Sequence, residues 1–480
     1  LIENIHNIFF VSIFSFIFLV ENIKKFKNFC LIKNNKIKKI DNLNDFSYQL
    51  IQKIIEKKNQ GFFQYVKPKS ISLIKSYLIK LNNLFCYSNS KKKIIVVGSL
   101  LSKKVQLFSK GKSIFEIKVI NDFKFYHIIS NFFTYFNILK KNKKFIFFPE
   151  ENYLTSNIIN DKLKNFVFSF KDNNIDIFKD IIFKILKDYC VRQTKIKNSI
   201  EKLINKSSLD KVFVDQLRFG VATVLANLCK QKNIDVILVP HGSVSEPDGE
   251  ISDFVLKICG RGLIFSNLAS HVVSQSKISF NAIKYFQNDT KIYKSSPILY
   301  GKTKLINEYP MNEFTFLHAS TPKSLNKWPW IYENYSEYVE NLKTIIYETA
   351  KFKNIKLIIR FREGPECDLK TFIKLIELKK NKHVHISNNK SFFDDLKLAK
   401  CLISFSSTSI EETLCLNKQV MIFSKYKSYK HINFPLDQMS IIYANKDNLA
   451  SELKKITRNK IILNNNILWD QENLNNNIFS

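Results

Sequence analysis

A loop rich in hydroxyl side chains, SFSSTSIEE, occupies residues 404–412 between a predicted strand and a predicted helix. Its consecutive hydroxyl-bearing residues are Ser406, Ser407, Thr408 and Ser409. Free backbone N–H groups and the dipole at a helix start attract anions, so the loop has the chemistry to hold a diphosphate. Glu412, about one turn into the helix, has the carboxylate to accept hydrogen bonds from ribose hydroxyls. There is also a structural alternative, because Ser409 and Glu412 fit the S-x-x-E capping box.

The turn PHGS, residues 240–243, follows another predicted strand. Gly242 permits a sharp turn, which would point His241 towards a ligand as a general base, because histidine titrates near neutrality. Three carboxylates follow closely: Glu246, Asp248 and Glu250. Asp248 is the alternative base, and Gly242, Ser243 and Glu246 belong to the same candidate loop. A structural role for His241 is the competing interpretation.

Two arginines stand at the end of the predicted strand KLIIRF: Arg360 lies within it and Arg362 directly follows it. Alternate residues of a strand share one face, and guanidinium groups suit phosphate. Both are therefore predicted to bind phosphate. Pairing with Glu363 or Glu366 is the structural alternative.

The segment HASTP, residues 318–322, again ends a predicted strand with small and hydroxyl residues. Such residues let a ligand approach the backbone closely, and Ser320 is the predicted phosphate-binding residue. A simple turn or helix cap is the alternative for this segment.

These loops all follow short apolar runs that alternate with helical stretches, which predicts α/β domains with parallel sheets. The predicted strands span residues 93–98, 144–148, 211–215, 235–239, 270–276, 291–301, 314–318, 356–361, 383–387, 401–405 and 419–423. Ligands bind outside the carboxyl ends of such strands. The fold class is therefore two tandem doubly wound, Rossmann-like domains facing a cleft.

The expected division of the chain is into an N-terminal α/β domain, a C-terminal α/β domain and a tail. The predicted bounds are 1–305, 306–465 and 466–480, with the linker near residues 302–311. A helix of residues 410–415 is expected to follow the Ser-rich loop. Further helices over 278–286, 335–352 and 392–399 are expected to connect other strands.

The composition favours a globular cytoplasmic protein. Hydrophobic residues make up 45% of the 480 residues. The formal charge of +33 comes mostly from lysine, and we attribute this excess of lysine to codon bias. We therefore expect no specific nucleic acid as a partner, although basic proteins can bind one. The cysteines are scattered, as in a reducing compartment. The apolar run 8–20 is shorter than the roughly 20 residues of a membrane span, so we expect a buried helix or, as the rival, peripheral contact with an anionic membrane.

Several catalytic and binding signatures are missing from the sequence. It contains no Walker A sequence, no G-x-G-x-x-G, no G-x-S-x-G, no H-E-x-x-H and no plausible D-x-D metal site. We therefore expect neither a metal requirement nor a cofactor.

Together, PHGS and ISFSSTSIEETLCLNKQVMIFS resemble the GT-B glycosyltransferase superfamily, particularly transferases of bacterial capsule and surface polysaccharide, over about residues 205–425. The resemblance implies that the C-terminal half binds the nucleotide and the N-terminal half the acceptor. Ser406, Ser407, Thr408 and Glu412 match the family turn that holds diphosphate and ribose. His241 and Gly242 match its H-G turn.

The predicted function is sugar transfer from a nucleotide-activated donor to a glycan or lipid-linked acceptor at the inner face of the plasma membrane. Turn N–H groups and Arg362 would stabilise the leaving nucleotide. The alternatives are a non-hydrolysing sugar-nucleotide epimerase and a glycerol-phosphate polymer transferase. A rival of another class is a basic protein that binds nucleic acid or membrane.

Overall fold

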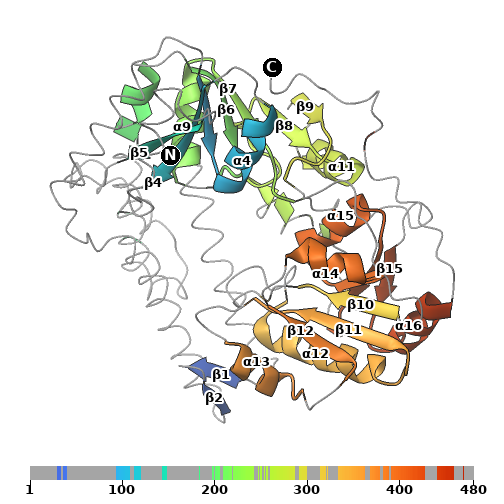
Figure 1. The fold of residues 1–480 in the computed structure, drawn as a ribbon. Helices are drawn as coiled ribbons and strands as arrows, with labels where there is room; N and C mark the ends of the chain where they lie inside the picture. The colour runs from blue at the N-terminus through green and yellow to red at the C-terminus, as the bar shows by residue number, and fades with distance from the viewer. Residues whose placement is uncertain are drawn as a thin grey trace, which may run out of the picture.

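The computed structural model is built from two parallel sheets with helices on both faces (Figure 1). The structure describes residues 30–33, 36–39, 93–108, 113–119, 143–148, 183, 187, 197–198, 200–205, 209–218, 220–242, 247, 249–250, 253, 256–257, 260–286, 291–299, 314–320, 322, 333–362, 368–378, 382–388, 391–426, 441–458 and 469. In this described part, no helix is long and apolar enough to cross a membrane.

The N-terminal sheet has seven parallel strands in the order β5-β4-β3-β6-β7-β8-β9. Its strands are β3 (Lys93–Val97), β4 (Ser113–Val119), β5 (Lys143–Phe148), β6 (Leu209–Val214), β7 (Asp235–Leu238), β8 (His271–Ser274) and β9 (Lys291–Lys294). Its helices include α4 (Ser99–Phe108), α9 (Val221–Gln231) and α11 (Lys277–Phe286). The order reverses between β3 and β6, which makes this pair the topological switch point.

Both faces of the N-terminal sheet are buried, which explains why its strands are continuous apolar runs. In β3, Ile95 packs with Val212 and Val214 of β6 on one face. The alternate residues Ile94 and Phe213 pack on the other face. The period of two thus supplies two separate cores from one sheet.

The C-terminal sheet has six parallel strands in the order β12-β11-β10-β13-β14-β15. They are β10 (Phe314–His318), β11 (Ile355–Arg360), β12 (Val384–Ser387), β13 (Cys401–Ser404), β14 (Gln419–Phe423) and β15 (Ile441–Ala444). The connecting helices are α12 (Tyr335–Thr349), α13 (Leu369–Leu375), α14 (Phe392–Leu398), α15 (Thr408–Cys415) and α16 (Leu449–Arg458). The switch point lies between β10 and β13.

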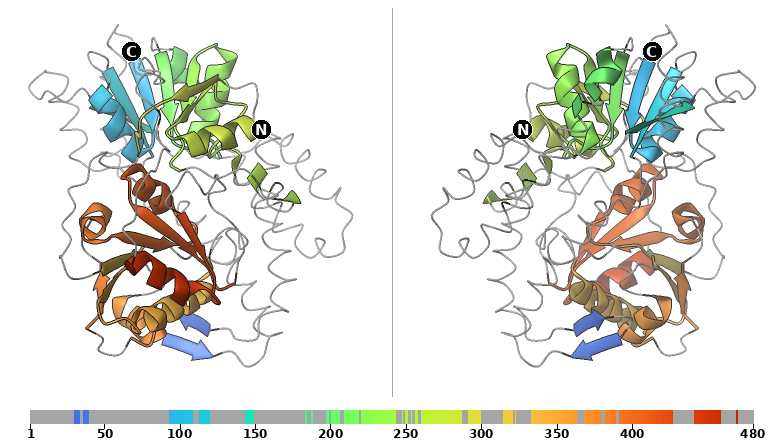
Figure 2. Two further views of the ribbon diagram at one scale, coloured as in Figure 1. Left: turned by 90° about the vertical axis from the view of Figure 1, so that its right-hand side faces the viewer. Right: turned by 90° about the vertical axis from the view of Figure 1, so that its left-hand side faces the viewer.

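The predicted fold class, two tandem doubly wound α/β domains, is confirmed. The predicted strands of both domains are present within two residues of their expected bounds, except that β9 ends at Lys294, well before the expected residue 301. Strands β4 and β15 and helices α4 and α16 are additions to the predicted set. A separate antiparallel pair, β1 (Cys30–Lys33) and β2 (Lys36–Lys39), lies at the end of the molecule occupied by the C-terminal sheet (Figures 1 and 2). The apolar run 8–20 lies outside the described residues.

The two domains meet through α11 and α15 (Figure 1). The Ser276 hydroxyl, just before α11, donates to Glu411 Oε1 of α15 at 2.5 Å, and both side chains are fully buried. Ile278 of α11 packs among apolar residues of the C-terminal domain, including Phe405. The carboxyl ends of the two sheets therefore face each other.

The predicted tail returns to the N-terminal domain at Trp469. Its indole Nε1 donates to the Ser274 carbonyl at 3.2 Å, and its ring meets Phe280 edge to face. The Lys294 ammonium lies 4.6 Å from the centre of the Trp469 ring, a cation–π contact. The chain thus crosses the junction of the domains twice.

We expect Ser276→Ala to lower the free energy of unfolding, because Glu411 keeps its buried carboxylate but loses a hydroxyl donor. Hydrogen bonds to charged groups contribute about 1.5–3 kcal/mol. A double-mutant cycle with Glu411→Gln, read by chemical unfolding, should give a coupling energy above about 0.5 kcal/mol. Ser451→Ala, at an exposed position of α16, is the control and should change little. Additive effects of the two interface changes would show that this bond does not hold the domains together.

Candidate functional site

The Ser-rich loop turns from β13 into α15, and Ser407 caps the helix. Ser407 has extended backbone angles, and its hydroxyl accepts from the Ser409 amide at 3.3 Å. The predicted capping box of Ser409 with Glu412 is wrong, because α15 begins at Thr408, two residues earlier than expected. Ser409 lies inside the first turn, and its hydroxyl donates to the Ala319 carbonyl at 3.1 Å.

The Ser406 hydroxyl is buried at the start of this turn. Only 8% of the residue is exposed, and within the described residues no hydrogen-bond partner meets its oxygen. An unsatisfied buried hydroxyl costs about 1–3 kcal/mol, and this one lies where α15 presents its first backbone N–H groups. A bound anion would accept hydrogen bonds from both the Ser406 hydroxyl and these N–H groups.

Ser320, from the loop after β10, joins this loop at the switch point. Its hydroxyl lies 3.2 Å from Ser404 Oγ and accepts from the Phe405 amide at 3.3 Å. Below it, His318 is wholly buried against the Tyr338 ring, and burial lowers the pKa of His318 to about 3. The predicted residue Ser320 therefore adjoins the Ser-rich turn, over a neutral histidine.

Glu412 lies on the first turns of α15, half-buried beside the buried Glu411. Burial raises the pKa of Glu412 to about 7, the neighbouring Glu411 raises it further, and Arg360 lowers it. Arg360 is therefore close enough to Glu412 for their charges to interact. The two predicted donor-site residues belong to one electrostatic cluster.

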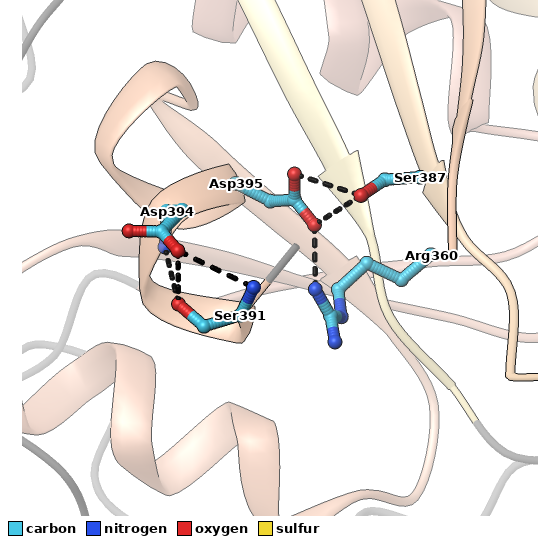
Figure 3. A network of polar contacts seen from close by, with 5 residues as sticks. All are labelled: Arg360, Ser387, Ser391, Asp394 and Asp395. Carbon is cyan, nitrogen blue, oxygen red and sulfur yellow. Dashed lines mark hydrogen bonds and ion pairs between the residues drawn. The ribbon is translucent and has the colours of Figure 1, made fainter. Parts of the chain in front are cut away.

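Arg360 is held by an acid that the sequence did not single out. Its Nη1 donates to Asp395 Oδ2 at 2.6 Å, and the Ser387 hydroxyl donates to both oxygens of Asp395 at 2.9 and 2.7 Å (Figure 3). The guanidinium also lies over the Phe392 ring. Asp395 is on α14 and Ser387 ends β12, so three elements fix this arginine.

Arg362 lies two residues beyond the end of β11 at Arg360 and is exposed. The shared face predicted for these two arginines stays a prediction. The predicted alternative partners Glu363 and Glu366 lie outside the described residues.

The PHG turn is fixed by Gln275, which the sequence analysis also missed. Its Nε2 donates to the Pro240 carbonyl at 2.7 Å, and its Oε1 accepts from the amides of Ile298 and Leu299 at 2.7 and 2.8 Å. Gln275 is fully buried, with both ends of its amide bonded. It therefore anchors the backbone that carries His241, whose side chain is exposed.

Gly242 brings the two predicted loops into contact across the domain junction. A Cβ atom placed on Gly242 would lie 2.4 Å from Thr408 Cγ2, the first residue of α15. Any larger residue at this position would require the Thr408 side chain to move. Ser243, Glu246 and Asp248 lie outside the described residues, whereas Glu250 is exposed.

Asp215, the first residue after β6, is a further titratable group at the N-terminal switch point. Burial raises the pKa of Asp215, while its own backbone and the charge of His241 lower it. The sequence placed this residue at a strand end without assigning it a role. The rule that ligands bind beyond strand ends would have found it, given the order of the strands.

No protein-family model matches the sequence, and no curated protein is similar to it. Solved structures that resemble the fold include a putative UDP-N-acetylglucosamine 2-epimerase from Listeria monocytogenes, at 9% identity and a TM-score of 0.47, covering 79% of this chain and 91% of that chain. The UDP-GlcNAc 2-epimerase of Methanocaldococcus jannaschii matches at 14% identity and a TM-score of 0.42, covering 80% and 96%. MurG of Acinetobacter baumannii matches at 9% identity and 0.41, covering 76% and 91%. These similarities concern the fold.

We expect the buried His318 to make the fold sensitive to acid. Its pKa is lowered to about 3 in the folded state, whereas in the unfolded chain it is about 6.5. Between these pH values the unfolded chain therefore binds a proton at His318 and the folded chain does not. Stability should therefore fall by about 1.4 kcal/mol per pH unit between these values. Unfolding curves of His318→Phe should lack this slope relative to the wild type, whereas His385→Gln, at an exposed site, should keep it. Equal slopes for wild type and His318→Phe would contradict the assignment.

The contact between Gly242 and Thr408 predicts a rescue. Gly242→Ala should lower the melting temperature, because overpacking costs about 1–3 kcal/mol. Adding Thr408→Ser removes the Cγ2 methyl that the new Cβ would meet, so the double variant should regain most of the loss. Thr408→Ser alone is the control. A double variant no more stable than Gly242→Ala would place the strain elsewhere.

Proposed function

We propose that this protein is a glycosyltransferase that moves a sugar from a nucleotide-activated donor to a hydroxyl group of a glycan or lipid-linked acceptor. The observation that supports it most is the contact of Gly242 with Thr408. It puts the turn carrying His241 against the first residue of the helix that offers N–H groups to an anion.

The donor nucleotide would lie over the C-terminal switch point. The N-terminal amides of α15 and the Ser406 hydroxyl would bind the diphosphate, with Ser407 and Thr408 shaping the turn. When ionised, Glu412 would accept hydrogen bonds from the ribose hydroxyls. Arg360, fixed by Asp395, and the exposed Arg362 would offset the negative charge that grows on the leaving phosphate.

The acceptor would approach from the N-terminal sheet. His241 would take the proton of the acceptor hydroxyl as that oxygen attacks the anomeric carbon. The bond from the anomeric carbon to the phosphate oxygen breaks, and its electron pair leaves with the nucleotide. The proton then passes from the imidazolium to solvent, so the reaction yields glycoside, free nucleotide and one proton. Asp248 keeps its place as the alternative base.

The acceptor class is proposed from the charge of the chain. Although we attribute the formal charge of +33 to codon bias, basic residues attract anionic lipid headgroups at about 1 kcal/mol per residue near the surface, whatever their origin. This favours a surface-polysaccharide or lipid-linked acceptor at the inner face of the plasma membrane. Neither a metal nor a cofactor enters the proposed reaction.

Sugar-nucleotide epimerisation is the second candidate, because two titratable groups, Asp215 and His241, interact at the same sheet edge. Removing and returning a proton needs such groups, and no acceptor is involved. Incubating the donor sugar alone distinguishes the two: an epimer would appear without acceptor, whereas a transferase would leave the donor sugar's configuration unchanged.

The first test is thermal unfolding with CMP, CDP, UDP, GDP and their sugars, with and without EDTA. A ligand at 100 times its Kd stabilises the fold by about 2.7 kcal/mol. We expect one nucleotide to raise the melting temperature regardless of EDTA, at pH 8, where Glu412 is ionised. Glu412→Ala should lose the shift, and Glu452→Ala on α16 should keep it. No shift with any nucleotide in folded protein would contradict the proposal and favour a basic nucleic-acid or membrane-binding protein.

A further inference from the structure

Three consecutive buried residues, Ser274, Gln275 and Ser276, lie at the junction of β8 and α11, and we call them the SQS turn. Each of them bonds a different part of the molecule. The Ser274 carbonyl accepts from the Trp469 indole of the tail at 3.2 Å. Gln275 bonds the PHG turn, and the Ser276 hydroxyl donates to Glu411 of α15. The SQS turn therefore lies where the two domains and the tail meet.

The SQS turn is held in one conformation by its own hydroxyl groups. The Ser274 hydroxyl donates to the Ser276 carbonyl at 2.7 Å. Ser276 and Ser279 each accept, on the side-chain oxygen, a hydrogen bond from the other residue's amide, at 3.3 and 3.2 Å. This is the reciprocal pattern of a capping box, at the start of α11. A displacement of Ser276 is therefore passed on to Gln275 and not absorbed between them.

The side-chain amide of Gln275 can bond in only one orientation. Its Nε2 faces an acceptor, the Pro240 carbonyl, and its Oε1 faces two donors, the amides of Ile298 and Leu299. The reversed amide would set donor against donor and acceptor against acceptor, in a residue that is only 1% exposed. Because His241 directly follows Pro240, Gln275 fixes the backbone from which the imidazole extends.

Helix α15 meets the N-terminal domain at two residues one turn apart. Thr408 approaches Gly242, whose added Cβ would lie 2.4 Å from the Thr408 methyl group, and Glu411 accepts from Ser276. Residues three apart lie on the same face of a helix. One face of α15 therefore contacts the PHG turn directly at Thr408 and through the SQS turn at Glu411. The first turn of α15, where an anion would bind, is thus connected to the backbone of His241 by buried hydrogen bonds.

We propose that Gln275 is a positioning residue for His241, and that the bond between Ser276 and Glu411 links it to α15, so that a nucleotide bound at the start of α15 steadies the PHG turn. This role rests on the proposed transfer reaction. Gln275 is too deeply buried to touch a reactant and exchanges no proton, so the balance of the reaction is unchanged. Its contribution is placement, and displacing a catalytic group by about 1 Å can lower a rate about a hundredfold.

The first test is a cycle of four proteins in sugar transfer: wild type, Gln275→Glu, His241→Gln and the double variant. Glutamate keeps the shape of Gln275 and its bonds to the two amides, but it presents an oxygen in place of a donor to the Pro240 carbonyl. We expect kcat to fall at least about tenfold while the KM for the donor stays unchanged. In the His241→Gln background the same change should have no further effect. A loss of equal size in both backgrounds would reveal a general structural role and overturn the proposal.

Gln419→Glu is the matched control, because Gln419 is also buried and begins β14, at the sheet edge away from the proposed site. The same change of side chain there should leave kcat and the KM for the donor unchanged. A loss of kcat as large as that of Gln275→Glu would mean that any buried carboxylate disturbs the reaction, which would also overturn the proposal. If Gln275→Glu does not fold, Ser276→Ala takes its place in the cycle, and it should lower kcat only where His241 is present.

A second measurement needs nucleotide binding but no turnover. Hydrogen exchange of the peptide covering residues 236–242 is followed by mass spectrometry, with and without UDP, CDP or GDP, whichever raises the melting temperature. We expect the nucleotide to slow exchange of this peptide in the wild type and to have a smaller effect in Gln275→Glu, because exchange reports local opening. Equal protection in both proteins, or none in the wild type, would overturn the proposal.

Failure of the proposed function has a different signature. A wild-type protein that binds no nucleotide or transfers no sugar would defeat the proposed function itself. A wild type that does both, and whose Gln275→Glu variant matches it in kcat and in hydrogen exchange, would defeat only the role of Gln275.

Discussion

The close approach of α15 to the PHG turn is the constraint on which the rest of the site depends. It depends on the absence of a side chain at Gly242, where a Cβ would meet the Thr408 methyl, and on a helix that starts at Thr408. It also buries Glu411 against Ser276 of the other domain. Because burying a carboxylate without a partner is costly, this hydrogen bond favours the arrangement in which the two domains meet here, together with the packing of Ile278. The PHG turn on one side of the junction and the start of α15 on the other are then held next to each other.

Support for the donor side extends through a chain of buried polar contacts. The Lys418 ammonium is buried and bonds the Leu396 and Ala399 carbonyls at the end of α14. Helix α14 carries Asp395, which holds Arg360, whose charge acts on Glu412. Lys418 is held by carbonyl oxygens, Asp395 by Arg360 and Ser387, and Glu412 is stabilised by Arg360 against burial and the neighbouring Glu411. The pKa of Glu412 therefore depends on α14, through the contact of Asp395 with Arg360.

The sequence predicted what local patterns determine. Apolar runs such as KIIVV and CLIS mark strands buried on both faces, and the turns at their ends follow from glycine and hydroxyl residues. It could not identify Asp395 as the partner of Arg360, 35 residues away, or Gln275 as the anchor of Pro240. Those contacts depend on the order of strands in the sheet. The start of α15 was misplaced because two serines compete to cap it, and only the tertiary contact of Ser409 with Ala319 decides between them.

The two switch points differ in the groups they present, and this difference bears on how the halves would divide a reaction. The C-terminal one offers donors: backbone amides, the Ser406 hydroxyl and a fixed guanidinium. The N-terminal one offers titratable groups, Asp215 and His241. Donors stabilise charge that develops on a leaving group, whereas titratable groups move protons from a nucleophile. A reaction that needs both at once can proceed only where the two sets meet, and in this chain that place is the contact of Gly242 with Thr408.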